Sequence, residues 1–241
     1  MRISNLRPGG RVRLGTRRST SAVAVDIGAD AIVALQPAAD GGRVRRAIVH
    51  PIPAGLVVDG EVVDPLGLAQ QLKALFGEHR LPRDVRVGLA HPRLMVRLVE
   101  LPGSIDGSEL DSAVRHLASD LLPVGLDQLV VDYRRLGRVP GSDRGGLQRI
   151  LMAAARIDGL DRLTAALDGA GLRLRSVALS GLAMIDALAH QSLPGEAILY
   201  VQAGALTNVV ITEEGRPLLV RAASAGSETI PRARRGRRRS S

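Results

Sequence analysis

The stretch from Ala22 to Leu35, Ala-Val-Ala-Val-Asp-Ile-Gly-Ala-Asp-Ala-Ile-Val-Ala-Leu, decides how this chain folds. Two runs of small and β-branched residues flank Asp26-Ile27-Gly28-Ala29-Asp30, which predicts a strand, a tight turn and a second strand. Gly28 has no Cβ, so a phosphate can approach the turn backbone, and Asp26 can hold a cation or its water. The pattern fits a nucleotide site, but Asp and Gly are also ordinary turn residues.

Composition narrows the class of protein. The chain has 241 residues, 45% of them hydrophobic, which is enough for a real core and for two domains. Its three aromatic residues leave little to stack on single-stranded bases. The absence of cysteine excludes disulfides and thiolate catalysis, and the five histidines show no metal-binding spacing. The sequence contains no stretch of 18 apolar residues, so it predicts no membrane-spanning helix.

The net charge of +9 is concentrated at the two ends of the chain. Residues 1–18 and 231–241 each carry six arginines and no acidic residue, so the remaining residues carry 9 − 12 = −3. We therefore expect a flexible basic arm over residues 1–20 and a disordered basic tail over 231–241. Such arms could touch nucleic acid or anionic lipid, which leaves a nucleic-acid-binding or lipid-binding protein as an alternative.

The residues after the opening stretch predict an antiparallel meander covered by a helix. Residues 43–50 are expected to form a third strand, and Asp59-Gly60 marks a hairpin turn. Asp64-Pro65 supplies an N-cap and a first helical residue, and Gly77 is expected to end that helix.

The middle of the chain mixes strands and helices. Strands are expected at 85–89, 94–101, 129–136, 147–155 and 172–179. Ser108 and Asp158 are expected to cap two helices, and a third is expected over 180–190. Residues 85–179 are therefore predicted to form a compact α+β insertion. From residue 197 a second strand, Gly-containing turn and strand repeat the opening layout, as two lobes gripping a phosphate chain would require.

Several segments together resemble one known family. They are Asp26-Ile27-Gly28-Ala29-Asp30, Gly55 to Pro65, Val99-Glu100-Leu101-Pro102, Leu122-Pro123 and Asp132-Tyr133. In order and spacing, from about residue 21 to Ile230, they resemble the actin-like pilus assembly protein PilM, a relative of the division protein FtsA. The resemblance implies a mixed α/β, actin-like ATPase fold.

The resemblance also implies a division of the chain. Residues 21–84 and 180–195 would form subdomain 1A, residues 85–179 the inserted subdomain 1C, and residues 196–230 the start of subdomain 2A. The second lobe would be incomplete, as in a C-terminally truncated PilM, with apolar strand faces left open near 197–221.

For function, the resemblance implies a scaffold of the type IV pilus inner-membrane platform and not an enzyme. In the family, a groove between 1A and 1C holds the N-terminal peptide of a PilN-type membrane protein. The implied location is cytoplasmic, at the inner face of the membrane, which the protein reaches only through partners such as PilN and other platform proteins. The segment Ile3 to Pro8 loosely resembles the Ile-Asn-Leu-Leu-Pro peptide that the family recognises, so the arm is a second candidate occupant of the groove.

The nucleotide site is expected to be degenerate. Its candidate residues are Asp26, Gly28, Ala29 and Asp30 in the first turn and Gln202 and Gly204 in the second. Gln202 stands where the family usually has an acidic residue, and a neutral amide attracts Mg²⁺ far less than a carboxylate does. We expect weak or lost ATP and Mg²⁺ binding, no metal site and no catalytic residue. The alternative is an ATP-binding protein or kinase of the actin superfamily.

Overall fold

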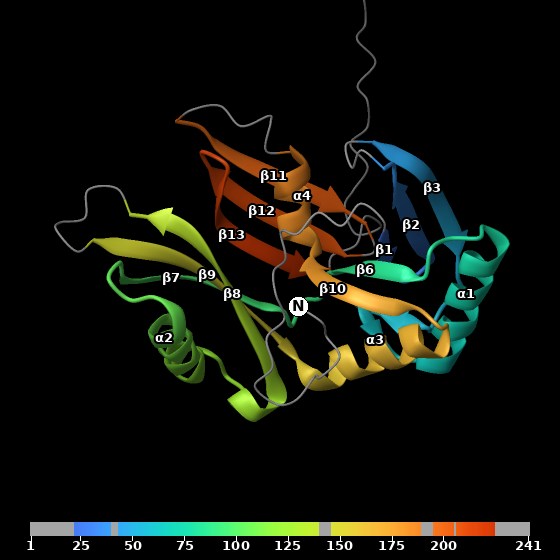
Figure 1. Cartoon of the computed structure of the whole chain (residues 1–241), viewed down its shortest axis with the longest axis horizontal. Coiled ribbons are helices and arrows are strands. Elements are labelled where there is room, and N and C mark those ends of the chain that lie inside the picture. The colour runs from blue at the N-terminus through green and yellow to red at the C-terminus, as the bar shows by residue number, and fades with distance from the viewer. Residues whose placement is uncertain (1–21, 40–42, 140–145, 189–194, 205, 225–241) are drawn as a thin grey trace, which may run out of the picture.

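The computed structural model describes residues 22–39, 43–139, 146–188, 195–204 and 206–224, and Figure 1 shows their arrangement. The strands are β1 (Val23–Ile27), β2 (Ala31–Pro37), β3 (Val44–Pro51), β4 (Val57–Val58), β5 (Glu61–Val62), β6 (Asp84–Leu89), β7 (Met95–Pro102), β8 (Leu129–Arg138), β9 (Leu147–Arg156), β10 (Arg173–Leu179), β11 (Ala197–Ala203), β12 (Thr207–Glu213) and β13 (Arg216–Ala223). The helices are α1 (Pro65–Glu78), α2 (Gly107–Leu121), the short 3₁₀ helix η1 (Leu126–Gln128), α3 (Ile157–Gly169) and α4 (Ser180–Leu188). The predicted arm, the predicted tail and the Ile3 to Pro8 segment lie outside the described residues.

The opening stretch forms the centre of a five-stranded sheet in the order β10-β6-β1-β2-β3. β1 pairs antiparallel with β2 and parallel with β6, and β6 pairs parallel with β10. Helices α1 and α3 pack on each other and cover one face of this sheet (Figure 1). The predicted meander and its covering helix are confirmed.

The start of α1 follows from its sequence. Asp64 is the N-cap, and its carboxylate accepts the Gly67 backbone N–H at 2.9 Å, with Pro65 at the first helical position. The predicted end at Gly77 is wrong, because the helix continues through Glu78 to a cap at His79. The left-handed residue that follows is Arg80, with φ of 49°.

The expected insertion of residues 85–179 is wrong in its bounds. β6 and β10 belong to the first sheet, and α3 packs on α1. The inserted unit is smaller: it comprises β7, α2, η1, β8 and β9, with its own sheet in the order β7-β9-β8. Strand periodicity marked β6 correctly as a strand, but its parallel pairing with β1 is non-local and has no local sequence signal.

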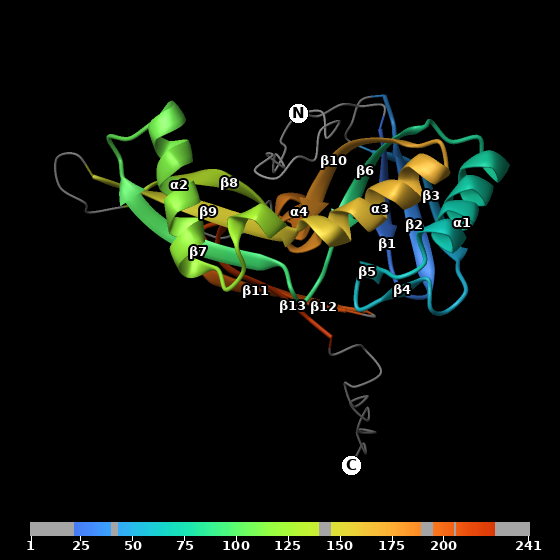
Figure 2. The same cartoon turned by 90° about the horizontal axis from the view of Figure 1, so that it is seen from below.

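Both faces of the inserted sheet are covered. One face packs against α2 through residues that include Leu110, Ile150 and Met152. The other packs against α4 and the meander β11-β12-β13, and Figure 2 shows the inserted sheet between α2 and that meander. The Arg221 guanidinium ties the two together by donating to the Val96 carbonyl at 3.2 Å.

The predicted second strand-turn-strand is confirmed as β11 and β12, and β13 completes the sheet β11-β12-β13. Its side facing α4 is buried, but Leu199 and Val201 on β11 are 60% and 54% exposed. The expectation of open apolar strand faces in this region is therefore confirmed.

Two predicted helix caps are wrong. Asp106, not Ser108, caps α2, and its carboxylate accepts the Gly107 N–H. Arg156 is the N-cap of α3 and makes no side-chain cap bond. Asp158 instead lies in the first turn, where its carboxylate pairs with Arg156 at 3.0 Å. Among the helices of the described ranges, none has the length and apolar character needed to cross a membrane.

Candidate functional site

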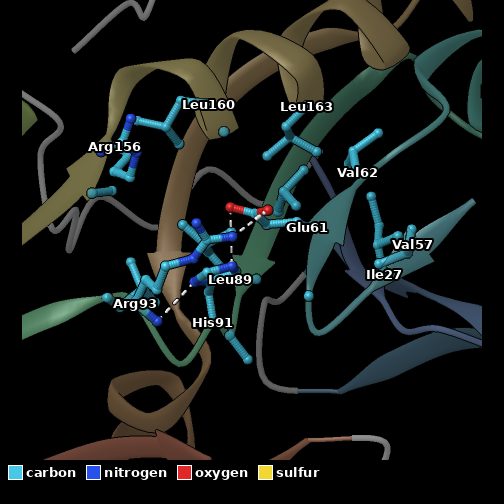
Figure 3. A pocket seen from close by; sticks show the side chains of 17 residues that line it. Ile27, Val57, Glu61, Val62, Leu89, His91, Arg93, Arg156, Leu160 and Leu163 are labelled. Carbon is cyan, nitrogen blue, oxygen red and sulfur yellow. Dashed lines mark hydrogen bonds and ion pairs between the residues drawn. The ribbon is translucent and has the colours of Figure 1, made fainter. Parts of the chain in front are cut away.

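A small pocket lies where the first sheet meets the inserted unit. Four segments form it: the end of β1, the β4-β5 hairpin, the end of β6 with the residues leading to β7, and the passage from β9 into α3 (Figure 3). Its lining residues are Ile27, Val57, Gly60, Glu61, Val62, Val87, Gly88, Leu89, Ala90, His91, Arg93, Leu94, Ala155, Arg156, Gly159, Leu160 and Leu163. The cavity has a volume of about 50 Å³, room for a few waters or one aliphatic side chain.

The turn between β4 and β5 sets the shape of the pocket. Asp59 and Gly60 both have positive φ, 50° and 76°, as a tight hairpin turn requires. A Cβ on Gly60 would lie 2.0 Å from the Ala90 carbonyl oxygen and 2.8 Å from Leu206 Cδ1. Only glycine lets the hairpin lie this close to the segment after β6 and to the turn after β11.

The interior of the pocket is apolar. Val57, Val62, Val87, Leu160 and Leu163 are each at most 5% exposed and line it from the hairpin, β6 and α3. An aliphatic side chain inserted among them would leave water at the usual gain of about 25 cal/mol per Å².

Glu61 is the centre of the polar groups around the pocket. Its Oε2 lies 2.6 Å from Arg93 Nη2 and 3.5 Å from Arg162 Nη2, so this carboxylate meets two cations. Arg162 also donates from Nε to the Val62 carbonyl at 2.9 Å, which joins α3 to the hairpin. Figure 3 shows Glu61 in the middle of the labelled side chains, with Leu163 on one side and His91 on the other.

His91 is buried beside Glu61 with one of its two ring nitrogens in use. The Arg93 backbone N–H donates to His91 Nδ1 at 2.8 Å, so the neutral ring carries its proton on Nε2. The buried Nε2 faces Glu61 Oε1 at 3.2 Å, and no described residue meets it in hydrogen-bonding geometry. Desolvation, opposed by the nearby Glu61 charge, lowers the pKa of His91 below its usual value.

The chemistry of this pocket suits binding. Among the described residues that line it there is no serine, threonine, cysteine or lysine, and the His91 imidazole faces a carboxylate already paired with arginines. Its apolar interior can take a side chain, and its charged rim can orient the chain that carries it.

The first predicted nucleotide turn, residues 26–30, lies between β1 and β2. The Gly28 N–H is used within the turn, where it donates to the Ala31 carbonyl at 2.9 Å, and the Asp30 carbonyl accepts the Ile52 N–H. Ala29 lies between them at the tip of the turn. The Gly28 N–H and the Asp30 carbonyl therefore already have partners within the protein.

Asp26 lies near the carboxyl end of β1, at the same edge of the sheet as the carboxyl ends of the parallel strands β6 and β10. A Cβ on Gly88 would be 3.1 Å from Asp26 Oδ1 and 3.0 Å from Ser180 Oγ, so Gly88 separates these two oxygens closely. Ser180 begins α4, and its Oγ is buried with no hydrogen-bond partner in the part of the chain that the structure describes. Asp26 is open to solvent on one side, and the protein packed on its other side raises its pKa by desolvation. Sequence reasoning identified Asp26 but missed Ser180, which nothing local to residue 180 marks.

The residues of the second predicted turn form hydrogen bonds within their own hairpin. Gln202 Oε1 accepts from Asn208 Nδ2 at 3.2 Å across β11 and β12, and the Gly204 N–H donates to the Leu206 carbonyl at 3.1 Å. The residues present thus fit ATP and Mg²⁺ only in part. Asp26 and Ser180 offer oxygens, whereas the Gln202 amide oxygen already accepts a hydrogen bond from Asn208. Within the described part of the chain, no three His, Cys, Asp or Glu side chains cluster as a metal site.

Sequence reasoning did not identify the network of charged residues in and beside the pocket. Glu61, His91, Arg93 and Arg162 come from three separate segments, and only Glu61 stood inside a quoted motif. A carboxylate directly after an Asp-Gly turn was the one available signal, and it does not indicate partners that lie 30 to 101 residues further along the chain.

Comparison with known proteins places this geometry in a family. The family model described as type IV pilus assembly protein PilM matches residues 24–230. The chain is similar to a chain of the solved PilM-PilN type IV pilus biogenesis complex, with a TM-score of 0.76 and 27% identity over 86% of this chain and 62% of that chain. It thus spans less than two thirds of that relative's length. No curated protein matches it.

A second solved structure shares the fold. The cytoplasmic domain of EpsL, an inner-membrane component of the type II secretion system of Vibrio cholerae, matches with a TM-score of 0.52 and 16% identity, over 84% of this chain and 71% of that chain. The actin-like ATPase fold predicted from the sequence is confirmed. Because the family match extends over most of its length, the chain belongs to the family of the type IV pilus assembly protein PilM.

Proposed function

We propose that this chain is a scaffold of the type IV pilus inner-membrane platform that binds the N-terminal segment of a PilN-type membrane protein. The observation that carries the proposal is the apolar pocket with a charged rim between the first sheet and the inserted unit. Its similarity to a chain of a PilM-PilN complex supports this choice of partner. The chain acts in this proposal by holding a peptide and turns over no substrate.

The proposed location follows from the partner. A chain that binds the cytoplasmic segment of an inner-membrane protein works in the cytoplasm at the inner face of the membrane. It reaches the membrane through that partner and through other platform proteins. Nucleic acid has no part in this proposal.

The test fills the pocket without disturbing the core. Gly159 lines the pocket in α3, and a Cβ there would meet nothing within 4 Å. Gly159→Leu should therefore occupy the space that a peptide side chain needs. Gly77→Leu is the matched control, because Gly77 is also helical, also has open space at its Cβ position and lies outside the pocket lining.

Binding is measured by isothermal titration of a synthetic peptide that contains Ile-Asn-Leu-Leu-Pro. The wild type and Gly77→Leu should bind equally, and Gly159→Leu should lose binding while it unfolds at an equal or higher urea concentration. Equal peptide affinity in all three proteins would exclude this pocket as the binding site.

We further propose that ATP binds weakly or not at all. The support is the hydrogen bond that holds Gln202 to Asn208, in the position where a carboxylate would organise the cation's water. Equilibrium titration with labelled ATP and Mg²⁺ should show no tight, saturable site. A tight site that disappears on Asp26→Asn would overturn this part and favour the ATP-binding alternative.

A further inference from the structure

A second pocket lies at the junction of β8, α4 and the hairpin that joins β12 to β13. β8 contributes residues 134–136, α4 contributes Leu182, Ile185 and Asp186, and the hairpin contributes residues 215–217. Its volume is about 170 Å³, against about 50 Å³ for the pocket of Figure 3. No described residue lines both pockets, so both can be filled at the same time.

The floor of this second pocket is apolar. Leu182 and Ile185 on α4 are 6% and 5% exposed, and Pro217 on β13 is buried. Leu136 on β8 packs against the cluster that contains both α4 residues. An aliphatic side chain placed over this floor is stabilised because it leaves water.

The rim carries two arginine side chains that are weakly held. Arg134 Nη1 lies 3.5 Å from Asp186 Oδ1, and the two side chains are 38% and 60% exposed, so this pair contributes little. Arg216 is exposed and makes no hydrogen bond or ion pair with any residue of the described ranges. Glu213 lies opposite Arg216 in the strand register, but the two side chains form no ion pair.

The backbone fixes where these two arginines stand. Glu214 and Gly215 have φ of 49° and 75°, as a tight hairpin turn requires, and Arg216 begins β13 directly after that turn. Arg134 lies within β8 and pairs with Leu151 of β9. A ligand that bridges the two arginines therefore needs only side-chain adjustments.

The neighbouring arginine of β8 is already used. The guanidinium of Arg135 pairs with Asp106, which caps α2. The cations available to a ligand are therefore Arg134 and Arg216.

Two arginines above an apolar floor suit a carboxylate that is next to an aliphatic group. The planar guanidinium can donate two parallel hydrogen bonds to one carboxylate. Asp186 is the competitor for Arg134, and at 3.5 Å it holds that arginine only loosely. A basic ligand would be repelled by both arginines and would gain only Asp186.

We propose that this pocket is a second docking site, which takes an acidic segment of a partner protein. A carboxylate of the segment lies between Arg134 and Arg216, and an aliphatic side chain of the segment covers Leu182 and Ile185. This inference goes beyond the proposed function, because it gives the scaffold a second partner at a site separate from the pocket proposed for the PilN-type segment.

The probe is the blocked peptide acetyl-Glu-Leu-Leu-Glu-amide, with acetyl-Lys-Leu-Leu-Lys-amide as its control. Titration into ¹⁵N-labelled full chain should move the backbone N–H signals of Leu182 and Gly215 with the acidic peptide and not with the basic one. A failure of the acidic peptide to saturate the protein below about 2 mM overturns the proposal.

Three substitutions test the charges of the rim with the acidic peptide. Arg216→Glu should weaken binding about tenfold. Arg45→Glu is the matched control, because Arg45 is also an exposed strand arginine and lies outside the lining, and it should stay within about twofold of the wild type. Asp186→Asn should tighten binding about two- to threefold, because it releases Arg134 and removes a repelling carboxylate. Equal weakening by Arg216→Glu and Arg45→Glu would exclude this pocket.

The pocket-filling variant Gly159→Leu separates this site from the proposed function. It should leave binding of the acidic peptide unchanged while it removes binding of Ile-Asn-Leu-Leu-Pro. Loss of the acidic peptide in Gly159→Leu would place that peptide in the first pocket and overturn the second site. A wild type that binds the acidic peptide but not Ile-Asn-Leu-Leu-Pro would contradict the proposed function and leave the second site standing.

Discussion

Arg162 on α3 and Glu61 on β5 face each other beside the pocket, with Nη2 3.5 Å from Oε2. The same arginine donates to the Val62 carbonyl, so one side chain joins the helix to both residues of a two-residue strand. This contact spans 101 positions of the chain between residues 61 and 162. It fixes the hairpin at the junction of the first sheet and the inserted unit.

Replacing Glu61 by glutamine should weaken the protein measurably. Its carboxylate is 20% exposed and compensates Arg93 and Arg162, which would be left close together without a counter-charge. We expect a loss of about 1–2 kcal/mol in the free energy of unfolding, measured in urea. Glu100→Gln is the control, because the Glu100 side chain is 41% exposed, twice as much as that of Glu61, and its loss should cost at most about 0.5 kcal/mol. Equal losses would mean that Glu61 is no more than a surface charge.

The free energy of unfolding should decrease as the pH is lowered through the range where histidine titrates. The pKa of His91 is lowered in the fold mainly by desolvation, with Arg93 and Arg162 also lowering it and Glu61 and Asp59 raising it. The unfolded chain therefore takes up this proton at a higher pH than the folded protein does. The stabilising contribution of neutral His91 is complete above the ordinary pKa of about 6.5 and is lost as the pH drops below it.

Urea unfolding at pH 7.5 and pH 5.5 tests this sign. The wild type should lose more stability between the two values than His91→Gln does, because the variant has no imidazole at that position. Asp84 and Asp158 stay ionised at both pH values, because ion pairs with arginine lower the pKa of each carboxyl below the ordinary value near 3.8. They therefore do not contribute to the difference in stability. A wild type and a variant with identical pH dependence would contradict the prediction.

Gly88→Ala should be destabilising, and Ser180→Ala should reduce that cost. The new Cβ would lie 3.0 Å from Ser180 Oγ and 3.1 Å from Asp26 Oδ1, closer than ordinary packing allows. Ser180→Ala alone removes a buried hydroxyl without a partner, so it should be neutral or stabilising by up to about 1 kcal/mol. A double-mutant cycle in urea should give a coupling of about 0.5–1 kcal/mol. Strict additivity would show that the two side chains do not meet.

The exposed apolar residues of β11 are expected to cause self-association, which charged substitutions at these positions should reduce. Leu199 and Val201 are 60% and 54% exposed on one strand of the β11-β12-β13 sheet. We expect Leu199→Lys with Val201→Lys to lower the fraction of associated protein in sedimentation velocity, with little change in the urea midpoint. Leu66→Lys, at a 77% exposed position of α1, should change neither quantity. An unchanged association in the β11 variant would exclude this strand as the contact.

Local sequence predicted the elements better than their partners. Asp64-Pro65 predicted the start of α1, and the turn at residues 26–30 predicted the β1-β2 hairpin, because caps and tight turns are made by neighbours in the chain. Ser108 and Asp158 failed as caps because Asp106 and Arg156 each occupy the capping position two residues earlier. Such a shift is within the ordinary uncertainty of helix ends.

The bounds of the inserted unit show where local reasoning ends. Val85 and Val87 have the alternation of a strand, yet nothing near them says that β6 pairs with β1 and not with β7. This pairing depends on the residues that bury Val85 and Val87, and those residues include leucines of α1 and α3, which come from distant parts of the chain. The family resemblance gave the fold class but not this boundary.

The amino-acid sequence by itself determined the opening hairpin, most of the strands and helices, the second strand-turn-strand and the family. These depend on spacing, turn residues and motifs, which are local properties. Only the tertiary structure decided which strands share a sheet and that Glu61, His91 and Arg162 meet at one pocket. The physical reason is that such contacts exist only after distant segments have packed, and a single sequence carries no local record of them.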